Sequence, residues 1–381
     1  MNIALNRLEG LIIEKDEYNI QVEKTISQNV ENFPDIYGSI LYPYNEIELG
    51  VSFREGTKHN VNIYKLLEKL RFKEDFGNIA FKNMEKVPVI CYFFPSSEAE
   101  IKVPPDVKLL KMFDVFYQRV NFNFQAIAIA FSTACWMVKD CCVTSTEFYQ
   151  FNYFNTYRVR NKIENIYTLS NGETSSLHFD REEINRAIEL TPKMYKYMLQ
   201  KKESSIKISE KIEELYTMES AGGNATLNIE GMLNPENSSF CRALVFLQRA
   251  RKSGYLVEKI EKYCSVLECL FAIQKKHKVN IKNITSAYIG NDIDESTIRN
   301  DMHDAFGIRS DFSHGDYIEF LKDHSEEQLK ELSQRIDGYV RRVLRKIFEE
   351  PDKNYTLKTR NEVRNYFDRI AKEKYPNDYK N

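Results

Sequence analysis

The sequence lacks two features that would assign it at once to a broad class of protein. It has no run of about eighteen apolar residues, the length that a membrane-spanning helix needs. The most apolar stretch, residues 126–138, is shorter and contains Ser132 and Thr133, so we expect no membrane association. A glycine-rich loop of the G-x-x-x-x-G-K type is also absent, which argues against a nucleoside triphosphatase.

Neither sign of charge dominates the chain. Its 54 Lys and Arg residues are balanced by 56 Asp and Glu residues, which gives a formal net charge of −2. A protein that coats nucleic acid is usually visibly basic, so this balance argues against that class. It does not exclude a small local site for a phosphate group.

The seven cysteines form no regular framework, and the six histidines are scattered. Neither the adjacent pair Cys141 and Cys142 nor the pair Cys264 and Cys269 has the spacing of zinc ligands. We therefore expect no metal and no other cofactor. No basic segment followed by an apolar one opens the chain, so we expect no secretory signal. Reduced thiols in the cytoplasm are the simplest interpretation.

The 381 residues suit two domains. We predict an α+β N-terminal domain over residues 1–205 and an all-α helical bundle over residues 206–381. In the first, branched and aromatic residues predict strands, and a short amphipathic pattern predicts a helix. The strands fall at 40–42, 47–53 and 87–94, and the helix at 63–72. The aromatic stretch 148–157 could stack bases, but a packed β core is the more frequent role.

After residue 172 the pattern changes to helix. Asp180 is a plausible N-cap, with Glu182 and Glu183 in the first turn, and we expect a break or kink near Pro192. The remaining helices are expected at 206–218, 255–273, 280–289, 295–305, 308–321, 324–349 and 356–374. Asp323 or Ser325 would cap the long helix at 324–349, and Pro351 would stop it. A loop is expected at 221–224.

The most informative segment is Arg309-Ser310-Asp311-Phe312-Ser313-His314-Gly315. A guanidinium stays charged at any biological pH and can hold a phosphodiester by two parallel hydrogen bonds. An imidazole titrates near neutrality, so it can accept or donate a proton during cleavage of RNA. Positions five apart lie about 140° apart around a helix, so Arg309 and His314 do not share a face.

This segment resembles the signature of the HEPN superfamily, Arg, four to six residues, then His, and in particular its Apea-like branch. Upstream, residues 263–271 are similar to the branch's "aLExLF" helix, and residues 284–288 stand where a short intervening helix is expected. The resemblance covers residues 235–350, about a third of the chain. The N-terminal half resembles no family that we recognise.

The resemblance implies a metal-independent endoribonuclease, a toxin or antiviral defence effector, that acts as a homodimer. His314 would be the general base or acid and Arg309 would stabilise the transition state. Ser310, Asp311, Glu268 and Gly315 would support them. Asp311 would orient the imidazole, Glu268 would pair with the arginine, and Gly315 would leave room beside the histidine. The N-terminal domain would restrain the nuclease or sense a phage-derived or cellular trigger.

A purely structural role stays open for each of these residues. Arg309 and Asp311 could form a surface ion pair, His314 could cap a helix, and Glu268 could be an exposed or capping residue. Arg341 and Arg345 belong to a basic stripe that could follow an RNA backbone, but a solvated helix face is the commoner case. A non-catalytic HEPN module that binds a protein or RNA is the alternative function.

Overall fold

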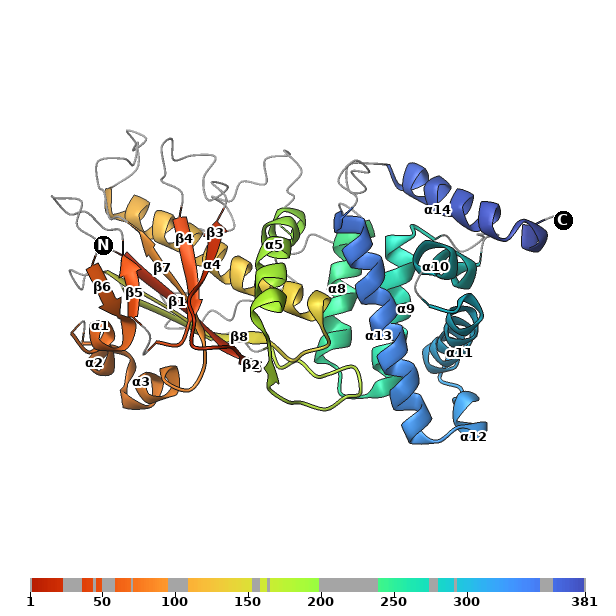
Figure 1. Ribbon diagram of the computed structural model, residues 1–381, viewed down its shortest axis with the longest axis horizontal. Helices are drawn as coiled ribbons and strands as arrows, with labels where there is room; N and C mark the ends of the chain where they lie inside the picture. Colours follow the sequence, from red (N-terminus) through yellow and green to blue (C-terminus); the bar gives the residue numbers. More distant parts are fainter. Residues whose placement is uncertain are drawn as a thin grey trace.

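The computed structural model describes residues 2–22, 36–43, 46–49, 59–69, 71–94, 109–152, 158–162, 165–198, 239–273, 280–290, 293–349 and 359–379. Within these, a mixed α/β N-terminal region with an antiparallel sheet is followed by a helical C-terminal part (Figure 1). The two parts lie end to end, and the chain termini lie at opposite ends of the molecule.

A six-stranded sheet organises the N-terminal part, and its strands stand in the order β3-β4-β7-β1-β8-β9. Every neighbouring pair is antiparallel. These strands are β1 (Asn2–Glu9), β3 (Tyr18–Val22), β4 (Ile36–Leu41), β7 (Val89–Phe94), β8 (Thr144–Asn152) and β9 (Arg158–Lys162). Two smaller pairs join β2 (Leu11–Ile12) to β10 (Leu177–His178) and β5 (Glu46–Leu49) to β6 (His59–Asn62).

Both faces of the sheet are buried, because helices cover each of them. The helix α4 (Leu109–Val138) packs on one face, where Ala4 and Leu8 of β1 point. The opposite face of β1, with Ile3 and Leu5, packs on three short helices. They are α1 (Ile63–Lys69), α2 (Phe72–Phe76) and α3 (Asn78–Met84). Alternate residues of β1 therefore point into two separate hydrophobic cores.

The helical part is built from helices that pack both on their sequence neighbours and on helices further along the chain. They are α8 (Ser239–Lys252), α9 (Leu256–Leu270), α10 (Ile281–Ile289), α11 (Glu295–His314), α12 (Phe320–Asp323), α13 (Glu326–Glu349) and α14 (Arg360–Lys374), followed by a short 3-10 turn, η4 (Pro376–Tyr379). A capping box of Thr359 and Glu362 starts α14, as expected for this side-chain pair.

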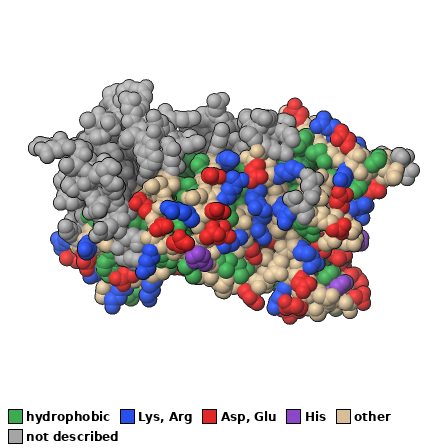
Figure 2. All heavy atoms as spheres, viewed as in Figure 1, with side chains coloured by type: hydrophobic (Ala, Val, Ile, Leu, Met, Phe, Trp, Pro, Cys, Tyr) green, Lys and Arg blue, Asp and Glu red, His purple; other side chains and the backbone are tan. Residues whose placement is uncertain are grey.

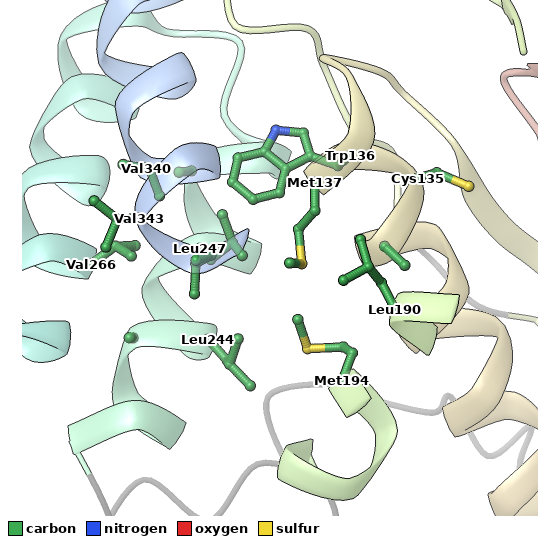
Figure 3. Close-up of a cluster of buried hydrophobic side chains, with 14 of the residues drawn as sticks. Cys135, Trp136, Met137, Leu190, Met194, Leu244, Leu247, Val266, Val340 and Val343 are labelled. Atoms are coloured by element: carbon green, nitrogen blue, oxygen red, sulfur yellow. The ribbon is translucent and has the colours of Figure 1, made fainter. Parts of the chain in front are cut away.

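A continuous apolar core joins the two parts. Trp136 and Met137 of α4 and Leu190 and Met194 of α5 (Arg181–Met198) come from the N-terminal side. They face apolar side chains of α8, α9 and α13 (Figure 3), namely Leu244, Leu247, Val266, Val340 and Val343. All of these side chains are buried, so the boundary between the sheet region and the helical region is packed like a protein interior.

One buried carboxylate lies in the middle of this joint. Asp337 of α13 is fully buried, and its Oδ1 accepts hydrogen bonds from Trp136 Nε1 at 2.9 Å and from the Tyr263 hydroxyl at 2.7 Å. Its Oδ2 accepts a third from Arg341 Nε at 2.6 Å. The carboxylate therefore ties α4, α9 and α13 together, with the charge of Arg341 as its counterion.

Two further cations are buried nearby. The Arg251 guanidinium donates to the Val143 carbonyl at 3.2 Å and stacks on the Tyr167 ring at 3.9 Å from its centre. The Lys259 ammonium donates to the Ala250 carbonyl at 2.8 Å. Burial lowers the pKa of Lys259 to about 8, against the opposing influence of Asp337. The ammonium is disfavoured there because it has left water for a site with little compensating charge.

Most of the expected elements are confirmed, with local corrections. Asp180 caps α5 in a reciprocal pair with Glu183. The helix α5 does not end at Pro192 but continues to Met198. Helix is confirmed over 295–305 and 308–314, but the predicted break between them and the predicted end at 321 are wrong, because α11 is one helix that ends at His314. The helix at 206–218 and the loop at 221–224 lie outside the described residues.

Replacing Asp337 by Ala should lower the free energy of unfolding by about 3–5 kcal/mol, because it leaves a largely buried arginine and two buried donors without their acceptor. Urea denaturation followed by circular dichroism measures this loss. As a control, Asp323→Ala on the exposed α12 should stay within about 0.5 kcal/mol of wild type. A loss below about 1 kcal/mol for Asp337→Ala would contradict the role of this carboxylate.

Lys259 makes the stability of the fold depend on pH. Between its folded pKa of about 8 and its ordinary value of 10.5, the unfolded chain binds more protons than the folded one, so stability rises with pH. Relative to Lys259→Met, wild type should gain about 2–3 kcal/mol between pH 7 and pH 10. Urea denaturation at intervals across this range tests the prediction, and parallel curves for the two proteins would refute it.

Candidate active site on α11

The helix α11 carries both residues of the Arg–His motif. It begins at the N-cap Asp294, whose carboxylate accepts the Thr297 N–H at 2.8 Å. Its buried face holds Ile298, Met302, Ala305 and Ile308, at the three- and four-residue spacing that turns one side of a helix to a core. Asp301 fixes it to α13 by accepting from Arg335 Nε at 2.9 Å and from the Tyr339 hydroxyl at 2.6 Å.

Arg309 is held by Glu268 of the neighbouring helix α9. Its Nη2 donates to Glu268 Oε2 at 2.8 Å, and both side chains are about one-third exposed, at 33% and 28%. Burial raises the pKa of Glu268, and the charge of Arg309 opposes that rise. Of the alternatives left open for Glu268 and Arg309, the structure shows the pair that the resemblance implies, and not the pair of Arg309 with Asp311.

The pairing decides which edge of the guanidinium can face a ligand. Arg309 Nε is buried and has no hydrogen-bond partner, and Nη2 already donates one hydrogen to Glu268. The donors that remain are on Nη1 and the second hydrogen of Nη2. A phosphate would therefore bind to the edge of the guanidinium formed by Nη1 and Nη2 and not to the edge that includes Nε.

His314 is the last residue of α11 and is exposed, as is Ser310 one turn before it. No hydrogen bond or ion pair with another residue of the described chain engages the imidazole, so its ring nitrogens can reach a substrate. The role expected for Asp311 is corrected, because its carboxylate accepts the backbone N–H of Glu319 at 2.9 Å instead of a histidine N–H. Since α11 is helical through both positions, Arg309 and His314 point about 140° apart.

Gly315 ends the helix in a left-handed conformation, with φ at +76°. Its N–H donates to the Phe312 carbonyl at 3.3 Å, and the next N–H, of Asp316, donates to the Asp311 carbonyl at 2.9 Å. This pattern of bonds closes many helix ends and favours glycine. A Cβ at Gly315 would meet nothing within 4 Å. Glycine is therefore needed at position 315 for its backbone conformation. It is not needed to leave space beside His314, because that space would stay open with a Cβ.

Exposed aromatic side chains surround the end of α11, and sequence reasoning did not find them. Phe312 is 36% exposed, Tyr255 58% and Tyr317 64%. The rings of Tyr255 and Phe312 lie 6.0 Å apart. The sequence could have indicated Phe312 by its position outside the apolar face of the helix. A large apolar side chain at such a position does not pack into the core of its own chain.

The basic stripe on α13 is only partly available to a ligand. Arg341 is bonded to the buried Asp337, as described above, and Lys346 donates to the Tyr288 carbonyl at 2.6 Å. Arg342 also has an intramolecular interaction. Arg345 differs from them: in the part of the chain that the structure describes, no hydrogen bond or ion pair engages its guanidinium. The stripe is thus neither a simple solvated face nor a uniform track of free cations.

No helix among the described residues is long and apolar enough to cross a membrane. Within the same residues, no three His, Cys, Asp or Glu side chains gather as they would around a metal ion. Comparisons with protein-family models, with curated proteins and with solved structures found no match to this chain.

Replacement by alanine should change the free energy of unfolding in opposite directions at Gly315 and at Gly307 of the same helix. Gly315→Ala should cost about 1–2 kcal/mol of unfolding free energy, because alanine disfavours positive φ. Gly307→Ala should add about 0.5–1 kcal/mol, since that glycine lies inside the helix and its Cβ would meet nothing within 4 Å. Chemical denaturation of both variants tests the pair of signs, and stabilisation by Gly315→Ala would contradict the assigned role of the glycine.

Proposed function

We propose that this chain is an endoribonuclease of the HEPN type, similar to the Apea-like branch, whose catalytic residues are Arg309 and His314. The observation that supports it most is the state of these two side chains. Arg309 is fixed across the α9–α11 contact by Glu268, while the imidazole of His314 is exposed at the end of the same helix. A positioned guanidinium and an accessible acid–base group are what metal-independent RNA cleavage requires.

In the proposed reaction, a His314 imidazole removes the proton of a ribose 2′-hydroxyl, and the resulting oxygen attacks the adjacent phosphorus. The bond from phosphorus to the 5′-oxygen breaks, and that oxygen takes a proton from an imidazolium. Arg309 stabilises the charge that builds up on the phosphoryl oxygens. The products are a 2′,3′-cyclic phosphate and a 5′-hydroxyl. DNA should resist cleavage because it has no 2′-hydroxyl.

A homodimer through the helical part would complete this site. The resemblance to HEPN proteins, which bring two copies of the motif together across one cleft, implies this dimer, and within one chain the two side chains diverge around α11. The exposed Phe312 and Tyr317 beside His314 would be covered by such a contact, which is a usual reason for aromatic exposure on a surface. The N-terminal part would restrain the nuclease until a phage-derived or cellular trigger acts, as a toxin or defence effector requires.

A second candidate, a non-catalytic binding module, is favoured by the charge around His314. Asp316, Glu319 and Asp323 are exposed near the end of α11, and Arg309 is already neutralised by Glu268. Together with the exposed aromatic rings, this surface suits a protein partner with basic and apolar side chains. The two candidates differ in whether His314 is needed for chemistry or only lies at an interface.

The deciding experiment measures cleavage of labelled RNA with EDTA present, together with growth of cells that express the chain. Arg309→Ala and His314→Ala should each lower the cleavage rate by about 100-fold or more and relieve growth arrest. Arg299→Ala and His303→Ala, on the same helix, serve as matched controls and should change neither. The products should carry cyclic-phosphate ends.

Two results would overturn the proposal that this chain is a nuclease. One is cutting that depends on a metal ion and survives both substitutions. The other is a wild-type protein that forms a stable dimer but neither cleaves RNA nor arrests growth, in uninfected cells and in cells infected with phage. The second result would favour the binding module, and loss of a captured partner on Phe312→Ala would then support it.

A further inference from the structure

A group of arginines lies where α5 and the C-terminal half of α13 meet. Arg341, Arg342 and Arg345 follow one another at the three- and four-residue spacing of a helix face. Arg186 of α5 joins them, because its Nη2 bonds to Glu349 one turn beyond Arg345. In Figure 2, Lys and Arg side chains gather near the middle of the face shown, over α13 beside α5.

Three carboxylates near this group are already engaged by arginines other than Arg345. Glu349 and Glu189 both bond to Arg186, and Asp337 bonds to Arg341. Arg345 is left with no hydrogen bond or ion pair among the described residues, although its side chain is only partly exposed. Its burial, and then the charges of Arg341 and its other arginine neighbours, lower its pKa against the pull of Glu349.

An unpaired, half-buried guanidinium next to other arginines is unfavourable in the free protein. It becomes favourable when an anion supplies the missing charge and acceptors, and the planar fork of arginine matches a phosphate group. We propose that Arg345, with Arg342 and Arg186, forms a binding site for a phosphate-bearing ligand at the junction of α5 and α13.

The site is separate from the Arg309–His314 motif and does not depend on RNA cleavage. Arg345 lies about 28 Å along α13 from its first residue, Glu326, and that first residue is the one nearest in sequence to α12 and the end of α11. A phosphate held between Arg186 and Arg345 would also link the two parts of the chain, because α5 belongs to the N-terminal side and α13 to the helical side. Several arginines favour a ligand with more than one negative charge.

The test is isothermal titration calorimetry of the full chain with pyrophosphate, and separately with a 2′-O-methyl RNA oligonucleotide that cannot be cleaved. Arg345→Gln should weaken binding by about tenfold or more, and Arg345→Lys should restore part of the affinity because it keeps the charge without the fork. Lys330→Gln removes one cation from the other end of α13 and should leave binding unchanged. Binding of pyrophosphate alone would identify a small phosphate ligand, and binding of the oligonucleotide alone would identify an RNA phosphodiester.

The stability of the free variant gives an independent check. Since Arg345 makes no bond in the free protein and is repelled by its neighbours, Arg345→Gln should melt at the same temperature as wild type or higher in low salt. Pyrophosphate should raise the melting temperature of wild type and not that of the variant. Equal affinities of wild type and Arg345→Gln, absence of binding by both ligands, or a variant that fails to fold would each overturn the proposal.

Discussion

The structure depends on one buried negative charge that three helices share. Asp337 is fully buried, and Trp136, Tyr263 and Arg341 surround its oxygens with the donors that a buried carboxylate needs. Each donor comes from a different place in the chain, and none of them could satisfy the carboxylate alone. An apolar core fixes how closely helices approach, whereas directional bonds to one carboxylate also fix their rotation and register.

The helix α9 carries this constraint to the candidate active site. Tyr263 points to Asp337, and Glu268, little more than one turn later, points to Arg309 on α11. The orientation of α9 therefore sets the position of the guanidinium, while Asp301 sets α11 against α13. His314 is free of both contacts because it follows the last buried position, Ile308, by more than one turn. Arg309 is therefore held in place and His314 is accessible, because the last turn of α11 extends beyond the core that buries the rest of the helix.

Sequence reasoning predicted helices well where apolar residues recur on one side, as in α9 and α13. It missed α4 as a helix and β1 as a strand, because α4 is buried all round between Phe124 and Met137 and β1 buries both faces, so neither shows a periodic pattern. It divided α11 near Gly307, although a glycine inside a helix weakens it without ending it. The contact of Glu268 with Arg309 was available from resemblance, but the lack of a partner for Arg345 depends on tertiary neighbours that no local pattern encodes.

Trp136 is the single tryptophan of the chain, and its indole N–H lies against the carboxylate that joins the two parts. The emission of an indole responds to charge and to water at its N–H, so the tryptophan fluorescence of this protein reports on the contact between its two parts. Separation of the sheet region from the helical region would change that emission without any introduced dye. The chain thus contains an optical probe at the contact between its two parts.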